Sequence, residues 1–127
     1  MGYHVVDPGE IEPSADHPCD RRSIADAADL ATVAAAVYAL DPGEQLPRFY
    51  HYHEQREELF YVLEGTLAVE TPEREYDVTE GSVFVAAPKS PHRPYNPEDA
   101  RGTARVLGVG APGYDPGRRY DPESGGG

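Results

Sequence analysis

Residues 48–65 of the chain read RFYHYHEQREELFYVLEG, and they carry its strongest structural signal. His51 and His53 stand two residues apart among aromatic and β-prone neighbours. Because successive side chains of a strand point to opposite faces, both imidazoles are expected on one face, together with Phe49. Burying two imidazoles is costly unless each has a polar partner, and a metal ion is the simplest partner that both can share.

Glu58 and His92 can complete such a ligand set. Glu57 is the alternative carboxylate, because strand parity puts these two acids on opposite faces and neither face is decisively apolar. His4 and His17 lie outside this pattern, and we interpret them as structural or exposed. Three imidazoles and one carboxylate suit a borderline divalent cation, so Zn, Mn, Fe and Ni all remain open.

Further along the chain, apolar residues mostly alternate with polar ones, and turn signals separate the runs. Strands are expected at residues 48–53, 58–63, 66–71, 74–78, 82–86, 92–95 and 103–109. Short strands at this spacing predict an all-β barrel or sandwich.

The region before residue 41 is less clear. Residues 3–6 form a candidate strand. Ser23 is a candidate helix N-cap followed by an alanine-rich run, whereas residues 32–40 alternate like a strand and end at the turn Asp41-Pro42-Gly43. These residues alone leave helix and strand equally open.

With 127 residues the chain is expected to form one domain, 1–127, with a barrel core at about 32–110. Residues 1–31 are expected to form an N-terminal arm and residues 111–127 a flexible tail. The lone cysteine, Cys19, excludes an internal disulfide and is interpreted as an incidental thiol in the arm. No apolar run is long enough for a membrane span and no secretory signal is present, so we expect a cytoplasmic protein without a membrane partner.

The net charge of −12 argues against nucleic acid as a partner, because phosphates would be repelled. Lys89 is the only lysine, and the acids are scattered along the chain. Because the acids are scattered, we favour the hypothesis of a halophilic protein with an acidic surface. The alternative, one acidic face that docks a basic partner, would require the acids to be concentrated in one block.

The stretch resembles the first motif of the cupin superfamily, in which His-x-His, a short spacer, Glu, six residues and Gly follow one another. The residues that match are His51, His53, Glu58 and Gly65. The second cupin motif is matched at Gly81, His92 and Asn96. Ala87 replaces the proline of that motif and Lys89 its glycine, so a re-formed turn is expected there.

The resemblance implies a small double-stranded β-helix, or jelly-roll barrel. It implies that three histidines and the acid at position 58 hold the metal, and that residues 32–40 form a strand. Small cupins are commonly dimers with crossing N-terminal strands, so the resemblance also implies a homodimer, with residues 3–6 and exposed tyrosines as contacts.

Phe49, Phe60, Val62 and Asn96 are the candidate pocket residues for a small-molecule ligand, with Arg48 or Arg93 as a possible carboxylate contact. Because the cupin fold supports many functions, two hypotheses remain. The favoured one is a metal-dependent enzyme of dioxygenase or isomerase type that acts on a small oxygen-containing molecule. The alternative is a non-catalytic binding or sensory cupin.

Overall fold

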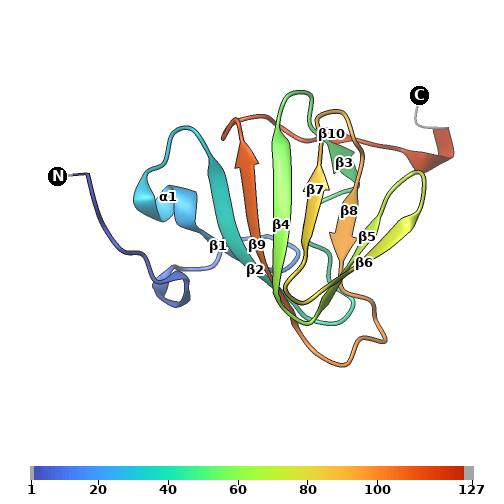
Figure 1. Cartoon of the computed structure of the whole chain (residues 1–127), viewed down its shortest axis with the longest axis horizontal. Coiled ribbons are helices and arrows are strands. Elements are labelled where there is room, and N and C mark those ends of the chain that lie inside the picture. Colours follow the sequence, from blue (N-terminus) through green and yellow to red (C-terminus); the bar gives the residue numbers. More distant parts are fainter. Residues whose placement is uncertain (1, 125–127) are drawn as a thin grey trace.

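A computed structural model of the protein describes residues 2–124 (Figure 1). The strands are β1 (Asp20–Ser23), β2 (Ala34–Leu40), β3 (His51–Tyr52), β4 (Glu57–Glu64), β5 (Thr66–Glu70), β6 (Glu75–Thr79), β7 (Val83–Ala86), β8 (Arg93–Tyr95), β9 (Ala104–Ala111) and β10 (Arg118–Arg119). The helical elements are η1 (Pro8–Glu10), α1 (Ile24–Ala28) and η2 (Pro122–Ser124). None of the helices within residues 2–124 is both long and apolar enough to cross a membrane.

The strands form two main antiparallel sheets, which face each other across one core. One sheet has the order β1-β2-β9-β4-β7 and the other β6-β5-β8, while β10 pairs with β3 at one end of the barrel. Neighbours such as β2 and β9 are far apart in the sequence, so the chain crosses repeatedly between sheets. The predicted all-β jelly-roll barrel, a double-stranded β-helix, is confirmed.

Inward-facing residues of both sheets fill the core. Leu40, Val62, Leu67, Val69 and Val106 are fully buried, and they come from four different strands. Each is expected to contribute about 2 kcal/mol through burial of its side chain. The core therefore holds the two sheets at a fixed separation beneath the histidine-bearing end.

The structure resolves the conflict between helix and strand before residue 41 by using both. The hydroxyl of Ser23 accepts a hydrogen bond from the backbone N–H of Asp26 at 3.1 Å and begins the short helix α1. Asp29 ends this helix in a left-handed conformation, with φ of 55°. The chain then enters β2, which has a partner strand on each side.

The predicted N-terminal arm is corrected in two places. Residues 3–6 lie outside every strand. By contrast, Asp20–Ser23 forms β1 and extends the large sheet beside β2, outside the predicted core limits of 32–110. Cys19 is buried against this core, and burial raises the pKa of its thiol to about 12. It is a core residue and not an incidental thiol in an arm.

Three positions of the cupin-like motifs, Gly65, Gly81 and Lys89, adopt backbone conformations that favour glycine. Gly65 has φ of 79°, and a Cβ atom there would lie only 2.9 Å from the carbonyl oxygen of Thr103, so the turn between β4 and β5 has no room for a side chain. Lys89 has φ of 65°. The second motif therefore keeps its glycine-type turn although a lysine occupies the position.

The segment after β9 is also more regular than expected. Arg118–Arg119 forms β10, and the backbone N–H of Tyr120 donates to the carbonyl of Tyr50 at 2.9 Å. The prediction of a tail without regular structure is therefore wrong for β10. The C-terminal segment, residues 112–120, runs along the end of the barrel that carries the histidines.

Candidate metal centre and adjoining cavity

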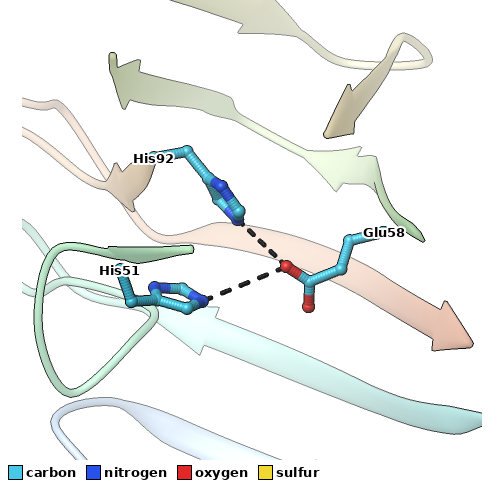
Figure 2. A group of neighbouring side chains, drawn as sticks. All are labelled: His51, Glu58 and His92. Carbon is cyan, nitrogen blue, oxygen red and sulfur yellow. Dashed lines mark hydrogen bonds and ion pairs between the residues drawn. The ribbon is translucent and has the colours of Figure 1, made fainter. Parts of the chain in front are cut away.

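Four side chains from separate parts of the chain converge at this end of the barrel. His51 lies on β3 and His53 just after it, Glu58 lies on β4, and His92 directly precedes β8. His51 and His92 are held side by side because their backbones form an antiparallel bridge. Figure 2 shows both imidazoles pointing at one oxygen of Glu58.

The distances from this oxygen define the cluster. Oε1 of Glu58 lies 3.0 Å from Nε2 of His92, 3.6 Å from Nε2 of His53 and 4.0 Å from Nε2 of His51. The ligand atoms of His51, Glu58 and His92 all lie within 4.8 Å of one another. His53 contacts Glu58 at 3.6 Å but is not a member of this three-residue group.

Backbone carbonyls fix the orientation of all three rings. Nδ1 of His51 lies 3.1 Å from the carbonyl of Phe49, Nδ1 of His92 lies 2.8 Å from that of Ser90, and Nδ1 of His53 lies 2.6 Å from that of Asp115. A carbonyl only accepts hydrogen bonds, so each Nδ1 must donate. In the neutral ring, Nε2 is then left with its lone pair facing Glu58.

Burial and charge set the ionisation of the cluster. Burial, followed by the nearby His92, lowers the pKa of His51 to about 4, so this ring is neutral at pH 7. Burial alone would raise the pKa of Glu58. The contact with His92 and the other two imidazoles outweigh burial, and the pKa of Glu58 lies below its usual value.

The donor set fits a divalent metal ion. Neutral imidazoles with Nδ1–H groups and an ionised carboxylate present only lone pairs to the space between them, and these repel one another unless a cation is present. Ligand bonds of about 2.0–2.2 Å to a zinc-like ion place neighbouring donor atoms about 3–3.6 Å apart. The contacts of 3.0 and 3.6 Å that Glu58 makes with His92 and His53 agree with this spacing, and its contact with His51, at 4.0 Å, is longer.

The structure also decides between the two candidate acids. Glu57 is exposed on the outer face of β4, whereas the side chain of Glu58 is 12% exposed and points inward. Strand parity at β4 was predicted correctly, but only the barrel defines which face is the inner one.

A cavity of about 420 Å³ adjoins the cluster and is lined by His51, His53 and Glu58. Phe49 and Phe60, two of the predicted pocket residues, form part of its wall. Val62 and Asn96 lie elsewhere. Val62 is fully buried in the core, and the amide of Asn96 donates to the carbonyls of Leu40 and Gly102, both at 2.9 Å. Asn96 thus joins the end of β2 to the loop before β9 and does not orient an imidazole.

Of the two predicted arginines, only Arg48 lines the cavity. Arg93 donates to Glu70 at 2.8 Å and stacks on the ring of Tyr95 at 4.2 Å. It is therefore paired away from the cluster.

Sequence reasoning missed three residues of this region. Tyr38, Arg21 and Arg56 all line the cavity. Two glycines of β9 make room for Tyr38 and Arg56, because a Cβ atom would lie 3.0 Å from the ring of Tyr38 at Gly108 and 2.7 Å from Arg56 at Gly110. The glycines at alternate positions in the sequence GVGA, residues 108–111, could have indicated that large side chains pack against this face of the strand. They do not indicate which side chains these are.

The C-terminal segment is the fourth omission. The carboxylate of Asp115 accepts hydrogen bonds from the backbone N–H groups of Gln55 and Arg56, both at 2.8 Å. These N–H groups, Gln55 first, hold the pKa of Asp115 below its usual value. The guanidinium of Arg56 donates to the carbonyls of Pro112 and Gly113 at 3.0 and 2.7 Å. The segment thereby fixes the loop between His53 and Glu58.

Comparison with known proteins agrees with the fold and the motifs. The family model of the cupin domain matches residues 36–110, more than half of the chain, and the protein belongs to this family. No curated protein matches the chain.

Solved structures with the same fold have several activities. The chain is similar to the polyketide cyclase RemF from Streptomyces resistomycificus, with 24% identity, TM-score 0.74, and coverage of 92% of this chain and 84% of that one. It is similar to a cupin-superfamily sugar phosphate isomerase from Silicibacter pomeroyi, with 24% identity, TM-score 0.71, and coverage of 85% and 75%. It is similar to KdgF from Halomonas sp., with 19% identity, TM-score 0.71, and coverage of 90% and 96%.

The chain spans 58% of the length of one further similar structure. At these identities the similarity establishes the double-stranded β-helix fold and does not transfer an activity.

Proposed function

We propose that the protein is a metal-dependent enzyme that acts on a small oxygen-containing molecule, with His51, His53, Glu58 and His92 as the metal ligands. The observation that carries this proposal is the convergence of four donor atoms, three of them on rings whose Nδ1 is already bound to a carbonyl. A metal bound there would act as a Lewis acid for a substrate oxygen, and iron or manganese would add redox chemistry. The donor set fits Zn, Mn, Fe or Ni.

The residues around the donors support a role in catalysis beyond metal storage. Tyr38 faces the cavity that Glu58 also lines, as a dedicated acid or base would. Burial raises the pKa of Tyr38, so its hydroxyl keeps its proton at pH 7 and can donate it to a substrate oxygen. Phe49 and Phe60 supply an apolar wall that excludes water from one side of the cavity. The alternative is a non-catalytic sensory or binding cupin, in which Tyr38 only fixes the ligand.

Elemental analysis of protein purified without added metal tests the site. We expect close to one metal ion per chain in the parent, and a large loss in each of His51→Ala, His53→Ala and His92→Ala, because each removes a ligand. His4→Ala is the matched control, since His4 is exposed outside the cluster. A triple alanine variant that holds as much metal as the parent would contradict the ligand assignment.

Turnover tests the enzyme against the alternative. Metal-loaded protein is incubated with a panel of small sugars, hydroxy acids and oxo acids, and the products are followed by NMR and by oxygen uptake. The enzyme proposal expects product formation that His92→Ala abolishes and Tyr38→Phe slows without loss of metal. Ligand binding without product in the presence of bound metal would favour the sensory cupin.

We further propose that two copies of the chain associate through the outer face of the large sheet. Two rows of apolar side chains cross this face on neighbouring strands. One row consists of Ala35, Val109, Leu59 and Val85, and the other of Leu107, Tyr61 and Val83. In a chain with a net charge of −12, a second copy is repelled from acidic surfaces, so these apolar rows, with Glu57 at their border, are the favourable contact.

Light scattering after gel filtration tests the dimer. The parent is expected to be a dimer, and Leu59→Glu with Val85→Glu a monomer, because these changes bring like charges together. Thr66→Glu is the control, since Thr66 is exposed on β5 of the other sheet. A monomeric parent, or a dimer that survives the double change, would contradict the proposal that this surface forms the dimer.

We also propose that the protein is located in the cytoplasm, and fractionation of the source cells tests this location.

A further inference from the structure

Three arginines line the cavity beside the donor cluster, namely Arg21, Arg48 and Arg56. The chain as a whole carries 23 acidic residues against 11 basic ones. A concentration of cations in one concave site of an acidic protein creates a local positive potential where a small anion gains most.

The three arginines differ in how far their charge is already used. Arg56 lies 3.6 Å from the second carboxylate oxygen of Glu58 and donates to two backbone carbonyls, so it supports the cluster and the C-terminal segment. Arg21 donates to the hydroxyl of Ser14 at 2.8 Å, and Arg48 donates to the backbone carbonyl of Asp16. Within residues 2–124, neither Arg21 nor Arg48 forms an ion pair with a carboxylate.

Arg21 and Arg48 act on the same part of the cavity. His17, which also lines it, has its pKa lowered mainly by burial, and both guanidinium groups lower it further. Arg21 also interacts with the hydroxyl of Tyr38. Two uncompensated guanidinium groups, a tyrosine hydroxyl and the donor cluster therefore face one space of about 420 Å³.

We propose that this cavity selects small substrates that carry an oxyanion group, a carboxylate or a phosphate, and that Arg21 and Arg48 hold this group while the oxygenated body of the molecule reaches the donor cluster. Guanidinium groups match both oxyanions because their N–H groups form paired, charge-assisted hydrogen bonds with two oxygens. The cavity volume lies within the range of about 300–1,000 Å³ that is usual for small-molecule sites.

This inference rests on the proposed function, because it names the substrate class of the same site. The residues that bind the anion are, however, different from those that bind the metal. Arg21 lies on β1 and Arg48 in the segment before β3, and neither is a proposed metal ligand. Arginine variants should therefore change anion binding and leave the metal content as it is.

Calorimetric titration of the metal-loaded protein with three probes tests the proposal. Succinate and inorganic phosphate carry the two oxyanion chemistries, and succinamide is the neutral counterpart of succinate. We expect millimolar binding of at least one anion and no binding of succinamide. The ratio of the succinate and phosphate affinities identifies the oxyanion that the site prefers.

Arg21→Gln and Arg48→Gln should each weaken binding of the preferred anion by about tenfold or more, because a charge-assisted pair is lost. Arg101→Gln removes an exposed arginine outside this cavity and should leave the affinity unchanged. Because Arg21 also binds Ser14, Arg21→Lys serves as a second variant that keeps the charge but loses the paired geometry; it should bind more weakly than the parent.

Three results would overturn the proposal: absence of binding by both anions, equal binding of succinamide and succinate, or parent-like affinity in both folded glutamine variants. Metal analysis of the same samples separates a failure of the anion proposal from a failure of the metal proposal. Arginine-dependent anion binding in protein that holds no metal would refute the metal proposal alone. Bound metal without arginine-dependent binding would refute the anion proposal alone.

Discussion

At the scale of the residue, Lys89 stands where the cupin motif has glycine and adopts the glycine-type conformation, with φ of 65°. Its backbone N–H donates to the carbonyl of His53 at 2.7 Å, so this turn positions a proposed ligand. The side chain itself is exposed. Backbone contacts therefore maintain the conformation, and the Cβ atom of the lysine is sterically strained in it.

Lys89→Gly should raise the free energy of unfolding by about 1 kcal/mol, because glycine adopts this φ without the Cβ clash. Lys89→Ala is the control, since it removes the side chain but keeps the strain, and it should match the parent. Urea denaturation measures both. A Lys89→Gly variant less stable than the parent would show that the turn is not strained.

His51 gives a residue-scale prediction for pH. Its pKa in the folded protein is about 4, below the usual 6.5, so between these values the unfolded chain binds more protons at this residue. The unfolding free energy of the metal-free protein should therefore rise as pH increases from about 4 to 6.5, by up to about 1.4 kcal/mol per pH unit, and then level off.

The His51→Gln variant should lose this component of the rise, whereas the exposed His4→Gln should keep it. Urea denaturation of chelator-treated protein at several pH values in the window measures the slope. If parent and His51→Gln have the same slope, His51 does not titrate as its burial requires.

At the scale of the element, the pair β3 and β10 is decisive for the site. β3 is only two residues long and is paired with β10 and bridged to His92. In addition, the carbonyl of Asp115 orients His53 from the C-terminal segment. Sequence patterns assigned a longer strand to residues 48–53, and the structure achieves the same common face for Phe49, His51 and His53 with much less regular pairing.

A chain truncated after Ala111 should bind its metal about tenfold more weakly, because His53 loses the carbonyl that fixes its orientation. A chain truncated after Asp121 keeps Asp115 and β10 and should match the parent. Chelator competition measures the affinity, and circular dichroism verifies that both barrels are folded. Equal affinities for the two truncated chains would mean that the C-terminal segment does not support the site.

At the scale of the whole molecule, the chain carries 23 acidic residues against 11 basic ones. The net charge is −12, and the described chain holds four arginine–carboxylate ion pairs. Like charges on a small barrel repel one another across its surface, and salt screens this repulsion with a Debye length of about 3 Å at 1 M.

The melting temperature should therefore rise from low salt to multimolar sodium chloride, as the halophile hypothesis requires. Sucrose, a non-ionic osmolyte, separates screening from a general solute effect. A melting temperature that sodium chloride leaves unchanged would remove the halophile hypothesis.

The sequence by itself determined the barrel, because a period of two between turns is a local pattern. It also supplied the candidate donors through the motif spacings from His51 to Gly65 and from Gly81 to Asn96, although the residues alone left Glu57 and Glu58 as alternatives. It also determined which face of β4 each acid takes relative to its neighbours. Only the tertiary structure decided that Glu58 faces inward, that Asp115 orients His53, and that Arg21 and Tyr38 reach the cavity. Glu58 and His92 are 34 positions apart in the sequence, and His53 and Asp115 are 62 apart. Arg21 and Tyr38 lie on strands that carry no motif, and only closure of the two sheets brings these residues to the cavity.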